Sequence, residues 1–357
     1  MQPAVRAEPR VAARPALLNR QRLQGGGALY AAILGLPLLL LVVALMLGAY
    51  PVEMADVLRV LASPLRPDLA ENIPEIVQRL ILNVRLPRVL AALLIGAGLA
   101  VAGVAFQGIF KNPLVDSNLL GVTAGAGFGA ALALLLRGTQ VQVQVAAFGF
   151  GLLAVSLAFF GSKLYSTAPM IVLTLMGILI GSLFGSLTSL LKYLADPLDA
   201  LPAITFWLLG GLTGVTWADI PLLAALTAAG ALVFVLIRWQ FNILSLGDAE
   251  AVTLGLNPNR IKLLIIVCAT LMTAIAVSVG GVIGWVGLVI PHAGRILVGP
   301  NHSRLIPASL ALGASFLLLI DTVSRTMLPT EVPLGVLTGL IGVPILIVLL
   351  RRNRTGW

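Results

Sequence analysis

Metal or haem binding is the chemistry that the two histidines of this chain suggest first. His292 and His302 lie ten residues apart, and Cys268 is the single cysteine. A resident metal needs several imidazole, thiolate or carboxylate ligands, and neither histidine has a carboxylate or thiol beside it in sequence. We therefore favour structural or interfacial roles for both histidines over the alternative of a haem or metal ligand, and expect no resident metal or cofactor.

Nucleotide hydrolysis and covalent catalysis are also poorly represented in the sequence. A phosphate-binding loop requires the pattern G-x-x-x-x-G-K-[ST], and the chain contains no Gly-Lys dipeptide. An intramembrane enzyme would need a nucleophile with a base, or a metal cluster, at membrane depth. The sequence provides neither, so we expect no catalytic residue and no ATPase activity.

The composition instead indicates a membrane protein. Hydrophobic residues make up 59% of the 357 positions and charged residues only 10%, and the mean hydropathy is +1.04. A helical crossing needs about 20 apolar residues, and many such stretches are separated by short polar segments. The predicted fold class is an all-α polytopic membrane protein of about ten transmembrane helices.

The predicted organisation is a tail at 1–28, a transmembrane domain at 29–350 and a second tail at 351–357. Hydrophilic loops at 50–87 and 194–216 interrupt the domain, and the first of them is long enough for a short helix. The expected spans are 29–49, 88–110, 117–136, 143–162, 169–193, 217–238, 261–283, 284–298, 305–327 and 334–350.

The charges predict the orientation of these spans. An even number of crossings puts both termini on one side, and the N-terminal tail carries five arginines and one glutamate. Most other basic residues then fall in loops on the same side, which is the cytoplasmic side by the positive-inside rule. Because these residues are spread over many short loops, the net charge of +9 does not indicate nucleic-acid binding.

A polar segment at 242–262, "NILSLGDAEAVTLGLNPNRIK", separates two expected spans on the inner side. It has room for a short helix that starts near Asp248, whose carboxylate is suited to cap the first turn, and that stops at Gly255. Such a helix suits docking to another protein. The alternative is an ordinary interfacial helix without a partner.

Several segments resemble the FecCD-type permeases, the membrane subunits of ABC importers for iron chelates, haem and cobalamin. The similar segments follow the family's order: "RLPRVLAALLIGAGLAVAGVAFQGIFKNPLVDSNLLGVTAGAG" at 85–127, "GDAEAVTLGL" at 247–256, "GWVGLVIPHAGRILVGPNHSRLIPASLALGASFLLLIDTVSR" at 284–325, and "EVPLGVLTGLIGVPILIVLLRR" at 331–352. The resemblance covers the chain from about residue 30 to 352.

The resemblance implies a homodimer in a bacterial or archaeal cytoplasmic membrane. Its implied partners are two ATP-binding subunits, which carry ATP and magnesium, a periplasmic or lipid-anchored substrate-binding protein, and a metal-chelate cargo. No cofactor bound to this chain is implied. The resemblance also implies that Pro291 ends a short helix near the inner face, with His292 and Arg295 at its polar exit.

The family's functional positions can be transferred residue by residue. The residues implied at the ATPase-coupling surface are Asp248, Glu250, Ala251, Leu254, Gly255 and Leu256. Those implied at the inner gate are Asn112, Leu114, Ser166 and Thr167. Arg325 matches a family position that docks the binding protein, and Arg59 and Arg66 in the 50–87 loop are further candidates for docking.

Each transferred role has an alternative in ordinary structural chemistry. Arg325 lies four residues after Asp321, so the two can pair on a helix, while Arg59 and Arg66 can be solvated loop charges. Asn112 precedes a proline, which is a common turn signal. The glycines and serines between 169 and 193, which with 334–350 would line the pathway, can instead serve helix packing.

The cargo remains open at this stage. We expect a ferric siderophore or haem, with cobalamin and molybdate or tungstate as alternatives. An ion-coupled secondary transporter would require ionisable residues deep inside the spans; Asp321 is the main candidate and is expected near the end of its span.

Overall fold

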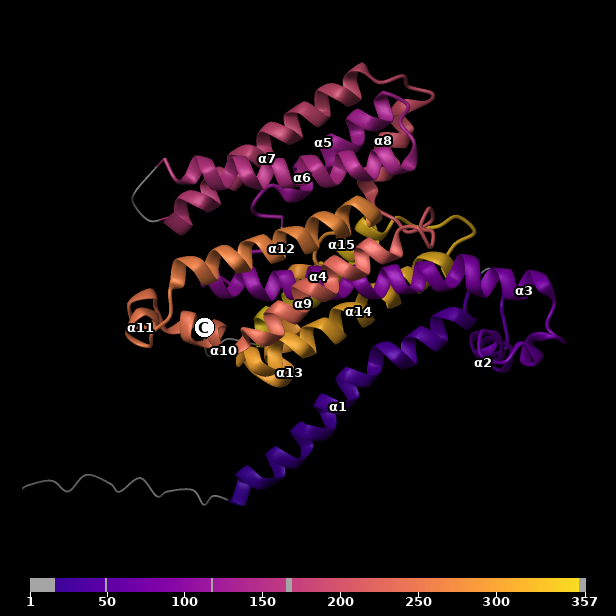
Figure 1. Ribbon diagram of the computed structural model, residues 1–357, viewed down its shortest axis with the longest axis horizontal. Helices are drawn as coiled ribbons and strands as arrows, with labels where there is room; N and C mark the ends of the chain where they lie inside the picture. Colours follow the sequence, from indigo (N-terminus) through magenta and orange to yellow (C-terminus); the bar gives the residue numbers. More distant parts are fainter. Residues whose placement is uncertain (1–16, 49, 117, 165–168, 353–357) are drawn as a thin grey trace, which may run out of the picture.

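The computed structural model describes residues 17–48, 50–116, 118–164 and 169–352 (Figure 1). Within these ranges all regular secondary structure is helical. The elements are α1 (Leu17–Met46), α2 (Met54–Ala62), the 3₁₀ turn η1 (Pro67–Ala70), α3 (Glu75–Arg79), the π turn η2 (Leu80–Arg85), α4 (Leu86–Phe110), α5 (Val122–Leu135), α6 (Gln140–Ser162), α7 (Pro169–Leu194), α8 (Ala200–Leu209), α9 (Ile220–Leu236), α10 (Arg238–Leu246), α11 (Asp248–Thr253), α12 (Pro258–Gly280), α13 (Val286–Val298), α14 (His302–Thr326) and α15 (Leu334–Arg352).

Helix α4 forms the centre of the bundle, with α9, α12 and α14 packed around it (Figure 1). Its small residues allow this packing, because helices in lipid approach closely only where side chains are small. A methyl group on Gly96 would overlap the carbonyl oxygen of Gly313 in α14, and one on Gly103 would overlap that of Gly287 in α13. Glycine at these positions therefore sets the distance between the central helices.

Helices α5, α6, α7 and α8 form a second group on one side of the centre (Figure 1). Helices α5 and α6 cross at Gly125 and Gly129, where an added methyl group would meet the backbone of Phe150 and Ala146. Both helices also contact α12, which joins this group to the central bundle. Helix α7 lies at the outer edge, and only 17% of its most apolar stretch is buried.

Six helices are long and apolar enough to cross a membrane, and the pair α9 and α10, bent by 58° at Ile237, brings the number to seven. This result confirms the all-α membrane class. The three other expected spans, 117–136, 284–298 and 334–350, correspond to the shorter apolar helices Val122–Leu135, Val286–Val298 and Leu334–Leu349.

The polar ends of the bundle contain more helix than the sequence indicated. Helix α2 provides the short helix expected in the 50–87 loop, and α8 occupies much of the segment 194–216. The span expected to start at residue 88 is part of a continuous helical run from Glu75. The helix begins earlier than the expected span because the π turn η2 joins α3 directly to α4, and the run continues through Pro87.

Arg85 connects this helical run to the end of α1. Its Nη1 donates hydrogen bonds to the carbonyl oxygens of Leu45 (2.6 Å) and Met46 (3.2 Å), and its Nη2 donates to that of Tyr50. These carbonyls lie at and just beyond the last turn of α1, which has no intrahelical donors for them. The cation also interacts favourably with the negative end of the helix dipole.

The glycine contact between α4 and α14 makes a stability prediction. We expect Gly96→Ala to lower the free energy of unfolding by about 1–3 kcal/mol, because the added methyl group meets backbone atoms rather than a flexible side chain. Gly149→Ala in α6 is the control, since a methyl group there meets no atom within 4 Å. Thermal unfolding in detergent measures both variants; equal stability would contradict the close-packing argument.

Candidate functional site

Helix α11 lies between two glycines in conformations that other residues rarely adopt. Gly247 precedes it with φ of 154°, and Gly255 follows it with φ of 80°. The N–H of Gly255 donates to the Val252 carbonyl and that of Leu256 to the Ala251 carbonyl, each at 3.0 Å, which closes the last turn. The result is a short helix held between two sharp turns at one end of the bundle (Figure 1).

An ion pair fixes α11 to the start of α12. Lys262 Nζ donates to both carboxylate oxygens of Asp248, at 2.7 and 2.6 Å. The lysine side chain is only 10% exposed, so it requires this nearby counter-charge. The expected capping role of Asp248 is therefore wrong: Gly247 is the N-cap residue without a side-chain cap, and the carboxylate turns towards α12 instead.

The residues expected at the coupling surface divide into exposed and buried positions. Glu250, Leu254 and Gly255 are exposed, as is Asp248. Ala251 is completely buried and belongs to the apolar core, so its expected place on a docking surface is wrong. Ala251 faces the core, whereas the exposed residues of α11 and of the turn after it face away from the core. Leu256 is half-buried.

The loop after α4 shows the turn chemistry that its Asn-Pro sequence predicts. Asn112 Oδ1 accepts a hydrogen bond of 3.0 Å from the Leu114 N–H, and Lys111 has a left-handed backbone with φ of 49°. Leu114 is 61% exposed. The other two expected gate residues, Ser166 and Thr167, lie outside the described residues.

The segment around Pro291 differs from the expectation, because α13 continues through the proline to Val298. A proline inside a helix frees the carbonyl four residues earlier, which is that of Gly287. Gln107 in α4 satisfies it: its Nε2 donates to the Gly287 carbonyl at 3.2 Å, and its Oε1 accepts from Arg295 Nη1 at 2.6 Å. Pro291 therefore does not end the helix, and Arg295 is tied to α4.

The two histidines have different surroundings. His292 is 1% exposed. His302 forms a 2.9 Å hydrogen bond between its Nδ1 and Asn242 Oδ1 and stacks on the ring of Phe241. Among the described residues, no group of three or more His, Cys, Asp or Glu side chains is placed to hold a metal ion.

A buried ion cluster, formed by Arg88, Asp321, Arg325 and Glu331, lies at the end of the bundle opposite α11. Arg88 Nε donates to Asp321 at 2.9 Å, and its two Nη atoms donate to the Glu331 oxygens at 2.8 Å. Arg325 Nε donates to the other Asp321 oxygen at 3.1 Å. Asp321 is completely buried. The hydrogen bonds from Arg88 lower the pKa of Glu331, which lies in the loop before α15.

The ion pair between Arg325 and Asp321, one of the two alternatives for Arg325, is confirmed. The Arg325 side chain is only 7% exposed and also donates to the carbonyl oxygens of Ala44 and Leu47 at 3.1 Å. Its guanidinium is thus engaged within the chain. Arg59 and Arg66 are exposed in the segment after α1, and Arg59 lies 3.5 Å from Asp56.

Sequence reasoning missed Arg88, Glu331, Gln107 and Lys262. Arg88 carried a usable signal, because an arginine within an apolar run requires a buried partner. Gln107 had a weaker signal, since a proline inside an apolar segment implies a donor on a neighbouring helix without identifying it.

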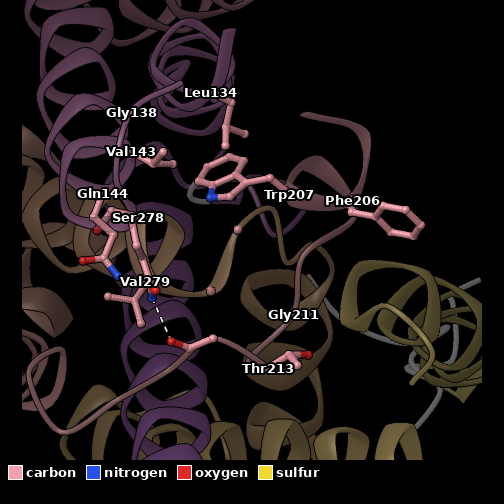
Figure 2. A pocket seen from close by; sticks show the side chains of 14 residues that line it. Leu134, Gly138, Val143, Gln144, Phe206, Trp207, Gly211, Thr213, Ser278 and Val279 are labelled. Atoms are coloured by element: carbon pink, nitrogen blue, oxygen red, sulfur yellow. Dashed lines mark hydrogen bonds between the residues drawn. The ribbon is translucent and has the colours of Figure 1, made fainter. Parts of the chain in front are cut away.

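Figure 2 shows a cavity of about 420 Å³ between the start of α6, the end of α8 and the end of α12. The indole ring of Trp207 lies against Leu134 and Val143, while Gln144 and Ser278 line another part of the wall. A backbone hydrogen bond of 2.9 Å from the Gly211 N–H to the Gly280 carbonyl joins two parts of the lining. Within the described part of the chain, the lining is neutral and contains no charged side chain.

Comparisons with known proteins identify similar transporters. The model of the FecCD transport family matches residues 36–352. The chain is 36% identical over 327 residues to the molybdate import system permease protein MolB of Haemophilus influenzae, which covers 91% of this chain and 96% of that protein. It is 35% identical over 279 residues to the hemin transport system permease protein HmuU of Yersinia pestis, covering 76% and 81%.

A solved structure is also similar over nearly the whole chain. It shows an inward-facing conformation of an ABC transporter of metal-chelate type, with a TM-score of 0.82 and 34% sequence identity, and the match covers 91% of this chain and 99% of that one.

The buried ion cluster makes a second stability prediction. We expect Asp321→Asn to lower the free energy of unfolding by about 3–5 kcal/mol, because it leaves the buried Arg325 without a carboxylate partner and Arg88 with Glu331 alone. Glu75→Gln is the control: it breaks a pair with Arg79 whose side chains are 71–75% exposed, which costs about 1 kcal/mol or less. Denaturation of both variants in detergent measures the two free energies of unfolding. Equal losses in the two variants would contradict a larger contribution from the buried cluster.

Proposed function

The chain belongs to the FecCD transport family, and from this membership we propose how its parts work within an importer. The chain is the membrane-spanning permease subunit of a binding-protein-dependent ABC importer of a bacterial or archaeal membrane, and it is not the ATPase. The proposed assembly contains two copies of this chain, two ATPase subunits that carry ATP and magnesium, and a substrate-binding protein.

We propose ten crossings with both termini in the cytoplasm. The six long helices and the bent pair α9 and α10 supply seven crossings, and the shorter apolar helices α5, α13 and α15 supply the other three. Helix α15 has 19 residues, which at 1.5 Å per residue gives about 28 Å, nearly the thickness of the hydrocarbon layer. The basic N-terminal tail supports this orientation.

We propose that two copies meet along α7 and α15 and form the pathway between them. Helix α7 is the most exposed helix of its group, and its exposed residues include Ser182, Ser186 and Ser189 as well as leucines. A helix that faced only lipid would have no need for a row of hydroxyl groups. Small polar residues line a path without binding a passing cargo tightly.

The single observation that supports ATPase coupling is the form of α11. Its exposed residues project from a short helix that two glycine turns isolate from α10 and α12, while the Asp248–Lys262 ion pair ties it to α12. A partner that moves α11 would therefore move the start of α12 with it. We propose Asp248, Glu250, Leu254, Gly255 and Leu256 as the coupling surface.

The remaining roles concern the two mouths of the pathway. We propose that Asn112, Leu114, Ser166 and Thr167 form the inner gate. For the binding protein we propose the exposed Arg59 and Arg66 as docking residues. Arg325 contributes indirectly in this proposal, by holding the end of α1 in place.

We propose a ferric chelate, either a siderophore complex or haem, as the cargo. The wall of the cavity in Figure 2 is neutral and partly aromatic, whereas an oxyanion taken out of water is costly to hold where no cation lies nearby. Molybdate is the second candidate, because the Haemophilus relative that covers 91% of this chain is named a molybdate import permease.

The coupling proposal predicts that Glu250→Arg and Gly255→Val each abolish most ATP-driven transport without unfolding the bundle. Reversing the charge of Glu250 changes the docking surface, and valine is strained at the positive φ of Gly255. Co-purification with the ATPase and ATP-driven uptake are the measurements.

Glu53→Arg, an exposed charge reversal before α2, is the control for Glu250. Gly299→Val, at φ of 86° with no atom within 4 Å, is the control for backbone strain. Uptake like that of the wild type in both coupling variants would refute the assignment.

The cargo proposal predicts ATP-dependent uptake of a radiolabelled ferric chelate into vesicles that contain the complete transporter. Uptake of haem, a ferric siderophore, cobalamin and molybdate is compared under the same conditions, with the Glu250→Arg transporter as the uncoupled control. Accumulation of molybdate alone would overturn the chelate assignment while leaving the permease itself intact.

A further inference from the structure

A second cavity, of about 810 Å³, opens at the same end of the bundle as α11 and is lined by basic and amide side chains. We call it the basic cavity. Its walls come from three places: the loop after α4, helix α10, and the turn between α13 and α14. The side chains that characterise it are Lys111, Asn112, Asn242, Arg295, Asn301 and His302.

The described residues that line the basic cavity do not balance its charge. Arg295 and Lys111 line it, and none of its described lining residues is acidic. Arg295 uses its Nη1 for Gln107, and no described carboxylate lies within 4.0 Å of its guanidinium. A partly buried guanidinium has five N–H donors and is costly to leave without an anion.

The positive-inside rule does not account for this arrangement. That rule places arginines and lysines in loops, where water solvates them, and Arg304, which is exposed, fits it. Arg295 instead lies in the wall of a cavity, held there by an amide of the central helix. A buried amide holds the cation in position but does not neutralise it.

Most amide groups around the cavity have already used their acceptor oxygens. Asn242 Oδ1 accepts from the N–H and Nδ1 of His302, Asn301 Oδ1 accepts from Asn242 and Ser303, and Asn112 Oδ1 accepts from Leu114. Within the described ranges, the Nδ2 groups of Asn112 and Asn301 have no acceptor and remain as donors.

His302 adds a buried polar atom without a partner. The residue is 7% exposed, and among the described residues its Nε2 has no hydrogen-bond partner. Because the Nδ1 of His302 donates to Asn242 Oδ1, this Nε2 is an acceptor, which suits the O–H of a singly protonated phosphate. Two cations and unused amide donors surround the same space. Groups of this kind recognise the oxygens of an anion.

We propose that the basic cavity binds a phosphate-type oxyanion, supplied either as free inorganic phosphate or as the phosphate monoester of a lipid headgroup. The bound anion bridges Arg295 on α13, Lys111 after α4 and the amide cluster at the start of α14. Asn242 and Ser245, also in the wall, belong to α10, which leads directly into α11. Occupancy would therefore restrain the segment that we propose to couple to the ATPase, although the binding itself does not depend on that proposal.

Binding is measured on the full chain alone, because an ATPase subunit would bring phosphate-binding sites of its own. The chain is placed in phosphatidylcholine nanodiscs and titrated with radiolabelled inorganic phosphate. We expect saturation at one phosphate per chain, a loss of affinity of at least about tenfold in Arg295→Gln and a smaller loss in Lys111→Gln. Arg304→Gln, which removes an exposed cation outside the cavity wall, is expected to bind like the wild type.

Nanodiscs that contain phosphatidic acid distinguish the two sources. If the headgroup occupies the site, it prevents phosphate binding to the wild type, and native mass spectrometry detects a retained phosphatidic acid that Arg295→Gln loses. If Arg295→Gln does not fold, Lys111→Gln, a change at an exposed residue, still tests the site. The proposal is overturned if neither phosphate nor phosphatidic acid binds saturably, or if Arg295→Gln and Lys111→Gln bind like Arg304→Gln. Loss of ATPase binding in Arg295→Gln, without phosphate binding by the wild type, would instead assign the cavity to a carboxylate of the ATPase.

Discussion

Backbone groups that are freed inside a membrane must find partners within the protein, because lipid offers none. This constraint decides how the helices of the permease can end and bend. Arg85 supplies donors to the carbonyls at the end of α1, and Gln107 supplies one to the carbonyl that Pro291 leaves free. Both donors come from the continuous run of η2 and α4. This central run therefore supplies hydrogen-bond donors to the free carbonyl groups of neighbouring helices.

The same central helix carries the polar contacts at both ends of the bundle. Arg88 joins the buried ion cluster, and Gln107 holds Arg295. These two residues are 19 positions apart, which corresponds to about 28 Å along a helix and nearly equals the thickness of the hydrocarbon layer. Between them α4 buries mainly glycine, alanine and aliphatic side chains. Its polar residues are thus spaced to lie at the two edges of the membrane.

Composition and long apolar stretches were sufficient to predict the all-α membrane class and the long apolar helices. The polar interruption at 242–262 was sufficient to predict a short helix that starts near Asp248, which the structure ends at Thr253. They failed where the outcome depends on a partner distant in sequence. Asp248 was expected to cap α11, but the buried Lys262 competes for its carboxylate. The resemblance implied that Pro291 ends a helix, but Gln107 donates to the Gly287 carbonyl that the proline leaves free, and the helix continues. The resemblance implied a surface position for Ala251, and a six-residue helix has too little sequence to show that this residue is buried.

The packing also indicates which parts of the permease can move. Helix α4 cannot shift against α13 or α14 without separating backbones in direct contact at Gly103 and Gly96, and the ion cluster would lose buried charge pairs if α14 moved away from it. Helix α7 has a similar backbone contact at Gly177, which lies against the Leu119 carbonyl, while its other side is exposed. The short segment from α10 to α11 is connected by a bend at Ile237 and by glycine turns. A movement that begins at α11 is therefore transmitted most easily to α10 and the start of α12. The central helices, which are closely packed, stay in place during this movement.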